Sequence, residues 1–217
     1  MIRHSSVKAI PAAPASPLVV FVDVDPAVRE SLDSLFRSIG LSTRLFGAPA
    51  ELLQQTLPDG PGCIILDVRL PGISGLDFQD QLGRHGIALP IIFMTGHGDI
   101  PMTVRAMKAG AVDFLAKPFR DQEMLDAVTA AIERDRERRS ASAALEDLRA
   151  AHATLTARER EVMTHVVAGL MNKQVAGILG LSEITVKIHR GNVMRKMGVR
   201  TLADLVRTAE ALGIPKP

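Results

Sequence analysis

Apolar and polar positions alternate along the first half of the chain in a way that predicts strands and helices in turn. Short apolar runs, typical of buried strands, are separated by stretches in which apolar residues recur at helical spacing. The predicted strands cover Leu18–Val24, Leu41–Phe46, Cys63–Leu66, Pro90–Met94 and Val112–Ala116. The predicted helices cover Ala27–Ile39, Ala48–Gln55, Gly75–Leu82 and Met102–Ala109, with a last one beginning near Asp121.

Five strand–helix units in succession predict an α/β domain, with a doubly wound, five-stranded parallel sheet and helices on both faces. We place this domain at residues 18–132. Residues 133–152 favour helix and contain neither Gly nor Pro, which predicts a long helical linker. The linker lacks sustained apolar heptads, so an exposed spacer is favoured over a coiled coil that joins two chains.

The last segment, residues 153–217, predicts an all-α domain of four helices. Thr156 followed by Glu159 has the spacing of a capping box at the start of the first helix. A helix over about 172–179 is expected to end at Gly180. The next helix begins after Ser182, and two helices joined by such a tight turn form a helix-turn-helix. We expect apolar side chains of both helices to pack together: Val175, Ala176, Ile178 and Leu179 from one, and Ile184, Ile188 and Met194 from the other.

Charge is unevenly distributed along the chain. The segment from Met1 to Ala130 holds 11 basic and 14 acidic residues, whereas the segment from His152 to Pro217 holds 10 basic and 5 acidic residues. This distribution predicts that only the basic end meets a polyanion such as double-stranded DNA. The chain has no Trp or Tyr, which disfavours stacking on single-stranded nucleic acid.

Several features predict a cytoplasmic protein with no membrane partner. Residues 1–17 are rich in Ala, Pro and Ser and lack the apolar stretch of a secretory signal, which indicates a disordered leader. No run approaches the roughly 18–20 apolar residues of a membrane helix. Cys63 is the only cysteine, so no internal disulfide can form.

Polar residues follow four of the predicted strands at the point where each strand ends. They are Asp23, Asp67, Thr95 and Lys117. In open α/β sheets, ligands bind outside the carboxyl ends of the strands. A carboxylate there can accept a phosphoryl group, with a divalent metal ion, a lysine and a hydroxyl neutralising or contacting its oxygens.

The residues from Val20 to Phe119 resemble the receiver domain of two-component response regulators. The resemblance is carried by three segments: Cys63–Gly75, which reads CIILDVRLPGISG, Ile91–Asp99, and Ala106–Phe119. It implies a flavodoxin-like fold, a sensor histidine kinase as partner and a homodimer when active. It also implies Asp67 as the phosphoacceptor, Thr95 and Phe114 as switch residues, Lys117 as the phosphate-contacting lysine, and a cis peptide between Lys117 and Pro118.

The same resemblance implies a Mg²⁺ site formed by Asp23, Asp67 and the backbone carbonyl of Arg69. The chain departs from the family here, because receivers usually have two adjacent acids and the second position is Val24. Asp25 is a further candidate ligand if the strand continues that far. Losing one carboxylate weakens a site for a hard cation. Three alternatives stay open: metal-weakened phosphorylation, regulation without phosphorylation, and a purely structural Asp67.

Residues 155–212 resemble the carboxy-terminal domain of the FixJ/NarL/LuxR regulators. The segments Gly169–Ala176, Thr185–Arg190 and Val199–Leu205 match its scaffold, recognition and fourth helices. The resemblance implies base-edge or phosphate contacts by Lys187 and Arg190, and a methyl contact by Val186. It also implies backbone anchoring by Asn172, Lys173 and Thr185, and dimerisation through Leu202, Leu205 and Val206.

Two other classes of protein fit parts of the sequence. Residues 23–28 resemble the nucleophile loop of haloacid-dehalogenase-type phosphatases, but that family also has a paired acidic motif, which is not found after Lys117. The other is an interaction module that binds a partner protein without phosphorylation. The leading hypothesis is a response regulator and transcription factor, not an enzyme in the ordinary sense, whose receiver catalyses its own phosphotransfer and dephosphorylation.

Overall fold

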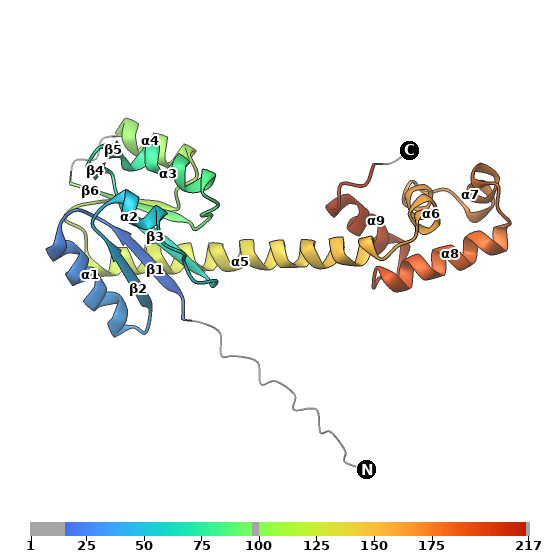
Figure 1. Ribbon diagram of the computed structural model, residues 1–217, viewed down its shortest axis with the longest axis horizontal. Helices are drawn as coiled ribbons and strands as arrows, with labels where there is room; N and C mark the ends of the chain where they lie inside the picture. Colours follow the sequence, from blue (N-terminus) through green and yellow to red (C-terminus); the bar gives the residue numbers. More distant parts are fainter. Residues whose placement is uncertain (1–15, 97–99, 216–217) are drawn as a thin grey trace, which may run out of the picture. The chain divides into compact units, whose positions relative to one another are not determined.

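The fold is described from a computed structural model, which defines residues 16–96 and 100–215 (Figure 1). The chain divides into two compact units, Met1–Arg139 and Ser140–Pro217. The predicted leader, residues 1–17, lies outside the described residues except for its last two positions. Across the described ranges, no helix has the length and apolar character needed to cross a membrane.

The first unit contains the predicted five-stranded parallel sheet. Its strands are β1 (Leu18–Val22), β2 (Ser42–Phe46), β3 (Gly62–Asp67), β6 (Ile91–Thr95) and β7 (Asp113–Ala116), in the spatial order β2-β1-β3-β6-β7. The register pairs Val22 with Leu66 and Asp67 with Met94. The strand ends therefore meet at one edge of the sheet, and the doubly wound α/β prediction is confirmed.

Helices cover both faces of this sheet, and the alternation of side chains along each strand divides the core in two. Helices α2 (Pro49–Leu53), α3 (Gly75–Arg84) and α4 (Ile100–Lys108) pack on one face, whereas α1 (Pro26–Ser38) and α5 (Asp121–Ala153) pack on the other (Figure 1). Ile64 and Leu66 face the first group of helices, and Cys63 and Ile65 face the second. All four side chains are fully buried, as expected for a sheet covered on both sides.

A small hairpin after β3 was not predicted from the sequence. Strands β4 (Arg69–Leu70) and β5 (Ile73–Ser74) pair antiparallel around a turn in which Gly72 has a φ of 79°. Gly75 begins α3 directly afterwards, and a Cβ at this position would lie 2.4 Å from the carbonyl oxygen of Asp67. The hairpin and this glycine therefore set the close return of the chain past the end of β3.

Helix α5 is continuous over 33 residues, so the last helix of the first unit and the expected linker helix are one element. At about 1.5 Å per residue such a helix is roughly 50 Å long. Its buried residues end at Asp135, and the first unit ends at Arg139.

The second unit contains four further helices after the end of α5: α6 (Ala157–Val167), α7 (Asn172–Leu179), α8 (Glu183–Lys196) and α9 (Leu202–Ala211). Thr156 and Glu159 form the predicted capping box. Gly180 ends α7 with a φ of 64°, and the Ser182 hydroxyl caps α8 by accepting a hydrogen bond from the Thr185 N–H. The predicted helix-turn-helix is therefore present in this unit.

The predicted packing between α7 and α8 was wrong at three isoleucines. Ile178, Ile184 and Ile188 are 56%, 74% and 60% exposed, whereas Val186 and Val193 are buried. Val186 and Val193 are seven residues apart, which places them on one face of the helix. Because this face already fills the core, the isoleucines of α8 lie on another side of the helix and point to solvent.

A partly buried ion pair joins α8 to the start of α6. The Lys196 ammonium donates to the Glu159 carboxylate at 2.6 Å and to the Thr154 carbonyl at 3.0 Å. The hydrogen bond from Lys196 is the largest of the interactions that lower the pKa of Glu159. Lys196 is therefore a structural residue of this unit rather than an exposed surface charge.

We predict that Lys196→Met lowers the free energy of unfolding of the second unit by about 1–3 kcal/mol at pH 7, because a buried carboxylate loses its charged partner. Since the folded pKa of Glu159 is lowered, the pair stabilises above the ordinary value of 4.5 and loses its effect as pH falls through the folded value. Urea unfolding followed by hydrogen exchange of α6 and α8, at pH 7 and pH 3.5, measures both effects.

The exposed Lys173 provides the control, because Lys173→Met removes the same charge without removing a described ion pair. It should change stability by less than about 0.5 kcal/mol. An equal loss for Lys196→Met at both pH values would contradict the assignment to the charged pair.

Candidate acidic site and nucleic-acid interface

The polar residues predicted at the strand ends come together at one edge of the sheet. Asp23 follows β1, Asp67 ends the neighbouring strand β3, and Thr95 ends β6. All three are buried, whereas Lys117, which follows β7, is half-buried. The parallel pairing of the strands places these residues together, although up to 94 positions separate them in the chain.

Lys117 bridges the two carboxylates. Its Nζ donates to Asp23 Oδ2 at 2.5 Å and to Asp67 Oδ2 at 2.8 Å. The other oxygen of each carboxylate accepts a backbone N–H at 2.9 Å, from Asp25 and Arg69 respectively. Each carboxylate oxygen in the pair therefore accepts a hydrogen bond, and the two carboxylates share one ammonium group.

The position of Lys117 is fixed by the backbone on both sides of its own residue. Its N–H donates to the Thr95 carbonyl at 2.7 Å, and the peptide bond to Pro118 is cis, as expected. Burial lowers the pKa of Lys117, but the hydrogen bonds and charges of Asp23 and Asp67 together raise it above its ordinary value. Lys117 is therefore a firmly charged group at this site.

Val24, which stands where receiver domains usually have the second of two adjacent acids, is open to solvent. Val24 is 44% exposed, and Asp25 turns away to cap α1, where its Oδ1 accepts a hydrogen bond from the Ala27 N–H at 2.9 Å. Within the described ranges, no three acidic, histidine or cysteine side chains gather in a group that could hold a metal ion. The available donors, Asp23, Asp67 and backbone carbonyls, are of the type that Mg²⁺ prefers, but only two carboxylates are present.

Phe114 lies on β7, next to the site. Its ring is partly buried against the core beneath α2, α3 and α4, with its centroid 6.4 Å from that of Phe93. The register pairs Phe93 with Phe114 and Thr95 with Ala116, so the aromatic ring and the Thr95 hydroxyl belong to adjacent strands.

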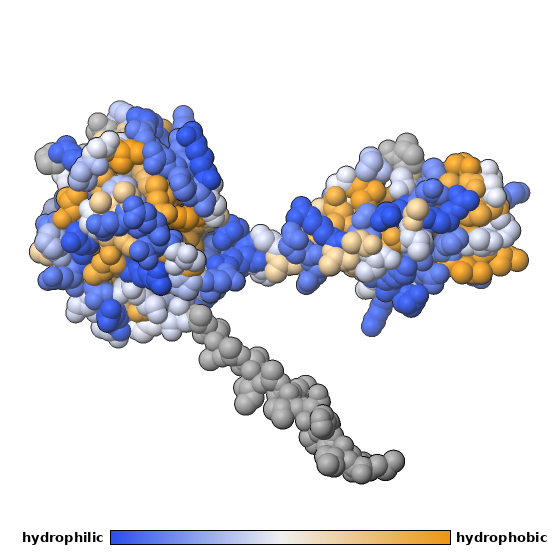
Figure 2. Space-filling model, viewed as in Figure 1, coloured by the Kyte–Doolittle hydropathy of each residue, from blue (hydrophilic) through white to orange (hydrophobic). Residues whose placement is uncertain are grey.

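The helix-turn-helix presents a mixed basic and apolar surface. Lys173 and Lys187 are exposed, and Arg190 Nη1 donates to Asn172 Oδ1 at 3.3 Å, which joins α8 to the start of α7. Thr185 is partly buried, with its hydroxyl 2.8 Å from that of Ser182. Figure 2 shows apolar surface next to hydrophilic residues at the end of this unit where α7 and α8 meet.

Two predicted contact residues are corrected by their burial. Val186 is fully buried in the core of its unit, so its side chain cannot reach a thymine methyl group. Leu205 is also fully buried, so it stabilises the unit itself and is not free to contact another chain. The remaining dimerisation candidates on α9 are Leu202, which is exposed, and Val206, which is partly buried.

The sequence reasoning also missed an exposed apolar stripe on α4. Ile100, Val104 and Met107 are 80%, 43% and 44% exposed. Their spacing of four and three residues places them on one side of the helix. The spacing was visible in the sequence, but an amphipathic helix has an apolar face in any case, and the pattern does not tell which apolar residues remain outside.

Two family models together cover most of the chain. Residues 19–129 match the response regulator receiver domain, and residues 153–209 match the bacterial regulatory proteins of the LuxR family. The chain therefore belongs to the response regulators that join a receiver domain to a LuxR-type DNA-binding domain, and it is a transcriptional regulator of this class. The receiver match leaves the phosphatase alternative for residues 23–28 without support.

Individual relatives cover nearly the whole chain. Nodulation protein W of Bradyrhizobium diazoefficiens is 61% identical over 197 residues, which is 91% of this chain and 87% of the relative. Among solved structures, the response regulator StyR is 47% identical with a TM-score of 0.79, covering 90% of this chain and 99% of the StyR chain. Full-length FixJ from B. japonicum is 37% identical with a TM-score of 0.55, covering 94% of this chain and 100% of the other.

Proposed function

We propose that this protein acts in the cytoplasm, where phosphorylation of Asp67 by a sensor histidine kinase controls its dimerisation and its sequence-specific binding of double-stranded DNA. The observation that carries this proposal is the Lys117 bridge between Asp23 and Asp67. An acceptor carboxylate with a fixed ammonium group beside it is suited to bind a dianionic phosphoryl group.

The residues of this chain have distinct roles in the proposed transfer. A carboxylate oxygen of Asp67 forms a bond to phosphorus as the bond from phosphorus to the donor nitrogen breaks. The ammonium group of Lys117 neutralises charge on the phosphoryl oxygens, and the Thr95 hydroxyl donates to one of them. Phe114, on the strand next to Thr95, then changes its packing. Hydrolysis of the acyl phosphate by water at the same residues returns the receiver to its resting state.

We predict that acetyl phosphate with Mg²⁺ adds one phosphoryl group to the wild-type protein and none to Asp67→Asn. Affinity for a duplex that the wild-type protein selects from random DNA should rise by roughly tenfold on phosphorylation, a typical coupling between two sites. Phosphate-affinity electrophoresis and fluorescence anisotropy measure the two effects. Asp77→Asn, an exposed acid on α3, provides the control and should behave as wild type.

A different result would favour regulation without phosphorylation, the alternative that Val24 raises. In that case the wild-type protein remains unlabelled, yet Asp67→Asn changes DNA affinity. If neither labelling nor any effect of Asp67→Asn is found, the carboxylate is structural and the proposed control at this site fails.

Mg²⁺ is the proposed cofactor, held by Asp23, Asp67 and the Arg69 carbonyl, and it supplies positive charge for the phosphoryl oxygens when bound. Asp25 is engaged as the cap of α1, so we no longer include it among the ligands. A site with two carboxylates in place of three should bind this cation weakly.

We predict that Val24→Asp increases the affinity for Mg²⁺ by at least about tenfold, because it restores a carboxylate to the open edge of the site. Isothermal titration calorimetry with MgCl₂ measures this change. Ile39→Asp is the matched control, because it adds the same charge at a similarly exposed apolar residue, beyond the end of α1 and outside the site. Equal Mg²⁺ affinities for Val24→Asp and wild type would contradict the assignment.

DNA recognition is proposed to use the exposed side of α8. Lys187 and Ile188 follow Ile184 by three and four residues, and all three are exposed, so they lie on one side of the helix. On this side of the helix, the ammonium group of Lys187 can contact a base edge or a phosphate. The methyl groups of Ile184 and Ile188 can contact the methyl group of thymine. Arg190 is a further candidate for base or phosphate contact, and Asn172, Lys173 and Thr185 are proposed to contact the backbone of the duplex.

We predict that Lys187→Ala lowers affinity for the selected duplex by about 1–3 kcal/mol without lowering the stability of the unit. Ile188→Ala should instead make binding insensitive to replacement of one thymine by uracil, which removes only a methyl group. Anisotropy titrations on thymine and uracil duplexes measure both effects. Val186→Ala should destabilise the fold by about 2 kcal/mol and leave the response to the thymine-to-uracil replacement unchanged, because its side chain is buried. Retained affinity in Lys187→Ala would contradict the assignment.

The active form is proposed to be a homodimer on two half-sites. Leu202 and Val206 on α9 remain the candidates for contact between DNA-binding domains. The apolar stripe Ile100–Val104–Met107 on α4 offers a second surface, on the receiver, for contact between two copies.

A further inference from the structure

Helix α5 carries a fully buried carboxylate at Asp135, in a segment of otherwise exposed charged residues. Arg138 donates twice to Asp135 Oδ1, at 2.7 and 3.0 Å. Arg139 Nε and the backbone N–H of Gly62 each donate to Oδ2 at 3.1 Å. Because a buried charge is costly unless it is fully paired, these four hydrogen bonds account for a carboxylate at this position.

The partner residue Gly62 connects this carboxylate to the acidic site. Gly62 is the first residue of β3 and Asp67 is the last. Five steps of about 3.3 Å separate these two residues by roughly 17 Å, so the two ends of one central strand hold the two groups. A Cβ at residue 62 would lie 2.4 Å from the Leu18 carbonyl oxygen on β1. The strand is therefore tightly held at this end, and Asp135 binds it where only glycine fits.

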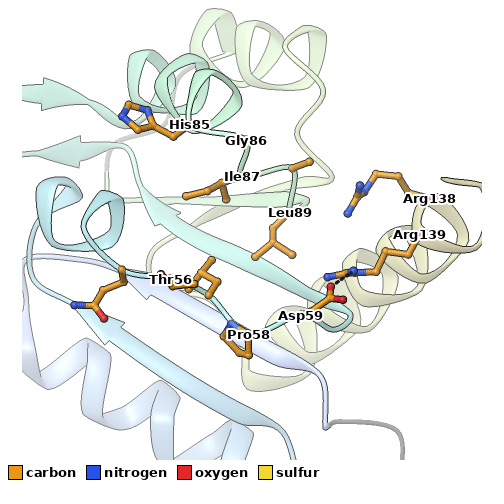
Figure 3. Close-up of a pocket in the computed structure, with 12 residues that line it drawn as sticks. Thr56, Pro58, Asp59, His85, Gly86, Ile87, Leu89, Arg138 and Arg139 are labelled. Atoms are coloured by element: carbon orange, nitrogen blue, oxygen red, sulfur yellow. Dashed lines mark hydrogen bonds and ion pairs between the residues drawn. The ribbon is translucent and has the colours of Figure 1, made fainter. Parts of the chain in front are cut away.

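A second, outer ion pair lies beside the buried one. Arg139 Nη1 donates to Asp59 Oδ1 at 2.6 Å, and this pair faces a cavity of about 520 Å³ between the 55–59 and 85–89 loops and the two arginines (Figure 3). The Asp59 side chain is 94% exposed, so this outer pair contributes little to stability. Of the polar contacts that join α5 to this end of the sheet, the hydrogen bond of Asp135 to Gly62 is therefore the stronger; it adds to the apolar packing of Ala131 and Ile132.

The attachment lies at the last point where α5 belongs to the receiver. The buried residues of α5 end at Asp135, and the compact receiver unit ends at Arg139, although the helix continues to Ala153. We propose that Asp135 is a positioning residue that clamps the linker helix to the amino end of β3, so that a change at Asp67 is passed along this strand to the helix leading to the DNA-binding domain. The second half of this statement rests on the proposed control by Asp67.

The chain contains a natural probe of this clamp. Cys63 is the only cysteine, follows Gly62, and is fully buried in the core beneath α1 and α5. Burial raises the pKa of its thiol to about 12, and the nearby charge of Asp135 adds to the rise. Loosening of α5 exposes this thiol to Ellman's reagent. Because removing the charge of Asp135 also changes the thiol pKa, the rate is measured across a range of pH, and the part of the increase that does not depend on pH reports how firmly the clamp is closed.

The test compares full-length Asp135→Asn with wild type. The amide oxygen is a weaker acceptor than the carboxylate, so the hydrogen bond from Gly62 that joins α5 to β3 is weakened, and the charge that pairs with Arg138 and Arg139 is lost. We expect Cys63 to react at least about tenfold faster than in wild type. Treatment with acetyl phosphate should still phosphorylate Asp67, but it should no longer increase the affinity for DNA. Glu137→Gln, an exposed acid two residues away on the same helix, should change neither quantity.

The two readouts separate failure of the clamp from failure of the proposed function. An unchanged Cys63 rate in Asp135→Asn overturns the clamp, and a faster rate with a full response to acetyl phosphate overturns its role in positioning. If wild-type DNA affinity does not respond to acetyl phosphate, the proposed function fails, and the Cys63 rate still decides whether the clamp exists. Should Asp135→Asn not fold, hydrogen exchange of the Gly62 amide in the wild-type protein tests the contact directly: exchange as slow as that of the other amides of β3 supports the clamp, and exchange as fast as that of an exposed amide overturns it.

Discussion

Two carboxylates buried at one edge of a parallel sheet are held there by a single ammonium group. Asp23 and Asp67 lie at the ends of adjacent strands, and the repulsion between them is relieved because Lys117 reaches both and a backbone N–H donates to each. The bridge requires the order β2-β1-β3-β6-β7, since this order brings the end of β7 to the ends of β1 and β3 through β6. A phosphoryl group on Asp67 would add negative charge beside the Lys117 ammonium group. Lys117 would then be shared between Asp23 and the phosphoryl oxygens.

Most of the fold followed from the sequence because its periodicities are strong. The central strands β1, β3 and β6 are almost continuous apolar runs, and burial on both faces requires such runs in a parallel sheet. The capping box at Thr156 and Glu159 is a local motif, so it could be found without knowledge of the rest. The β4–β5 hairpin was missed because two-residue strands have no periodicity, and its glycines are also typical of an irregular loop.

The residues of the candidate sites were harder to predict where their exposure depends on which side of a helix faces the core. In α8, the sequence alternates apolar and basic residues, and both Val186 and Ile188 suit a methyl contact. Only the packing of α8 against α6 and α7 shows that Val186 is inside and Ile188 outside. The same holds for Leu205. Asp135 was not singled out at all, because an acid in a charged helix gives no signal of burial until its distant partner, Gly62, is known.

The replacement of one acid by Val24 links the Lys117 bridge, the metal site and the contact of Asp135 with Gly62. With Val24 in place of a carboxylate, the edge of the sheet has less negative charge, and the Lys117 ammonium already balances half of what remains. Charge added at Asp67 then meets fewer neighbouring anions but also a weaker metal site. In the proposed phosphorylation of Asp67, the electrostatic change would therefore be carried more by Lys117 and by the backbone of β3 than by a tightly bound cation. A strand that is fixed at Gly62 by Asp135 is suited to pass on such a change, because a displacement at one end cannot be absorbed by slack at the other.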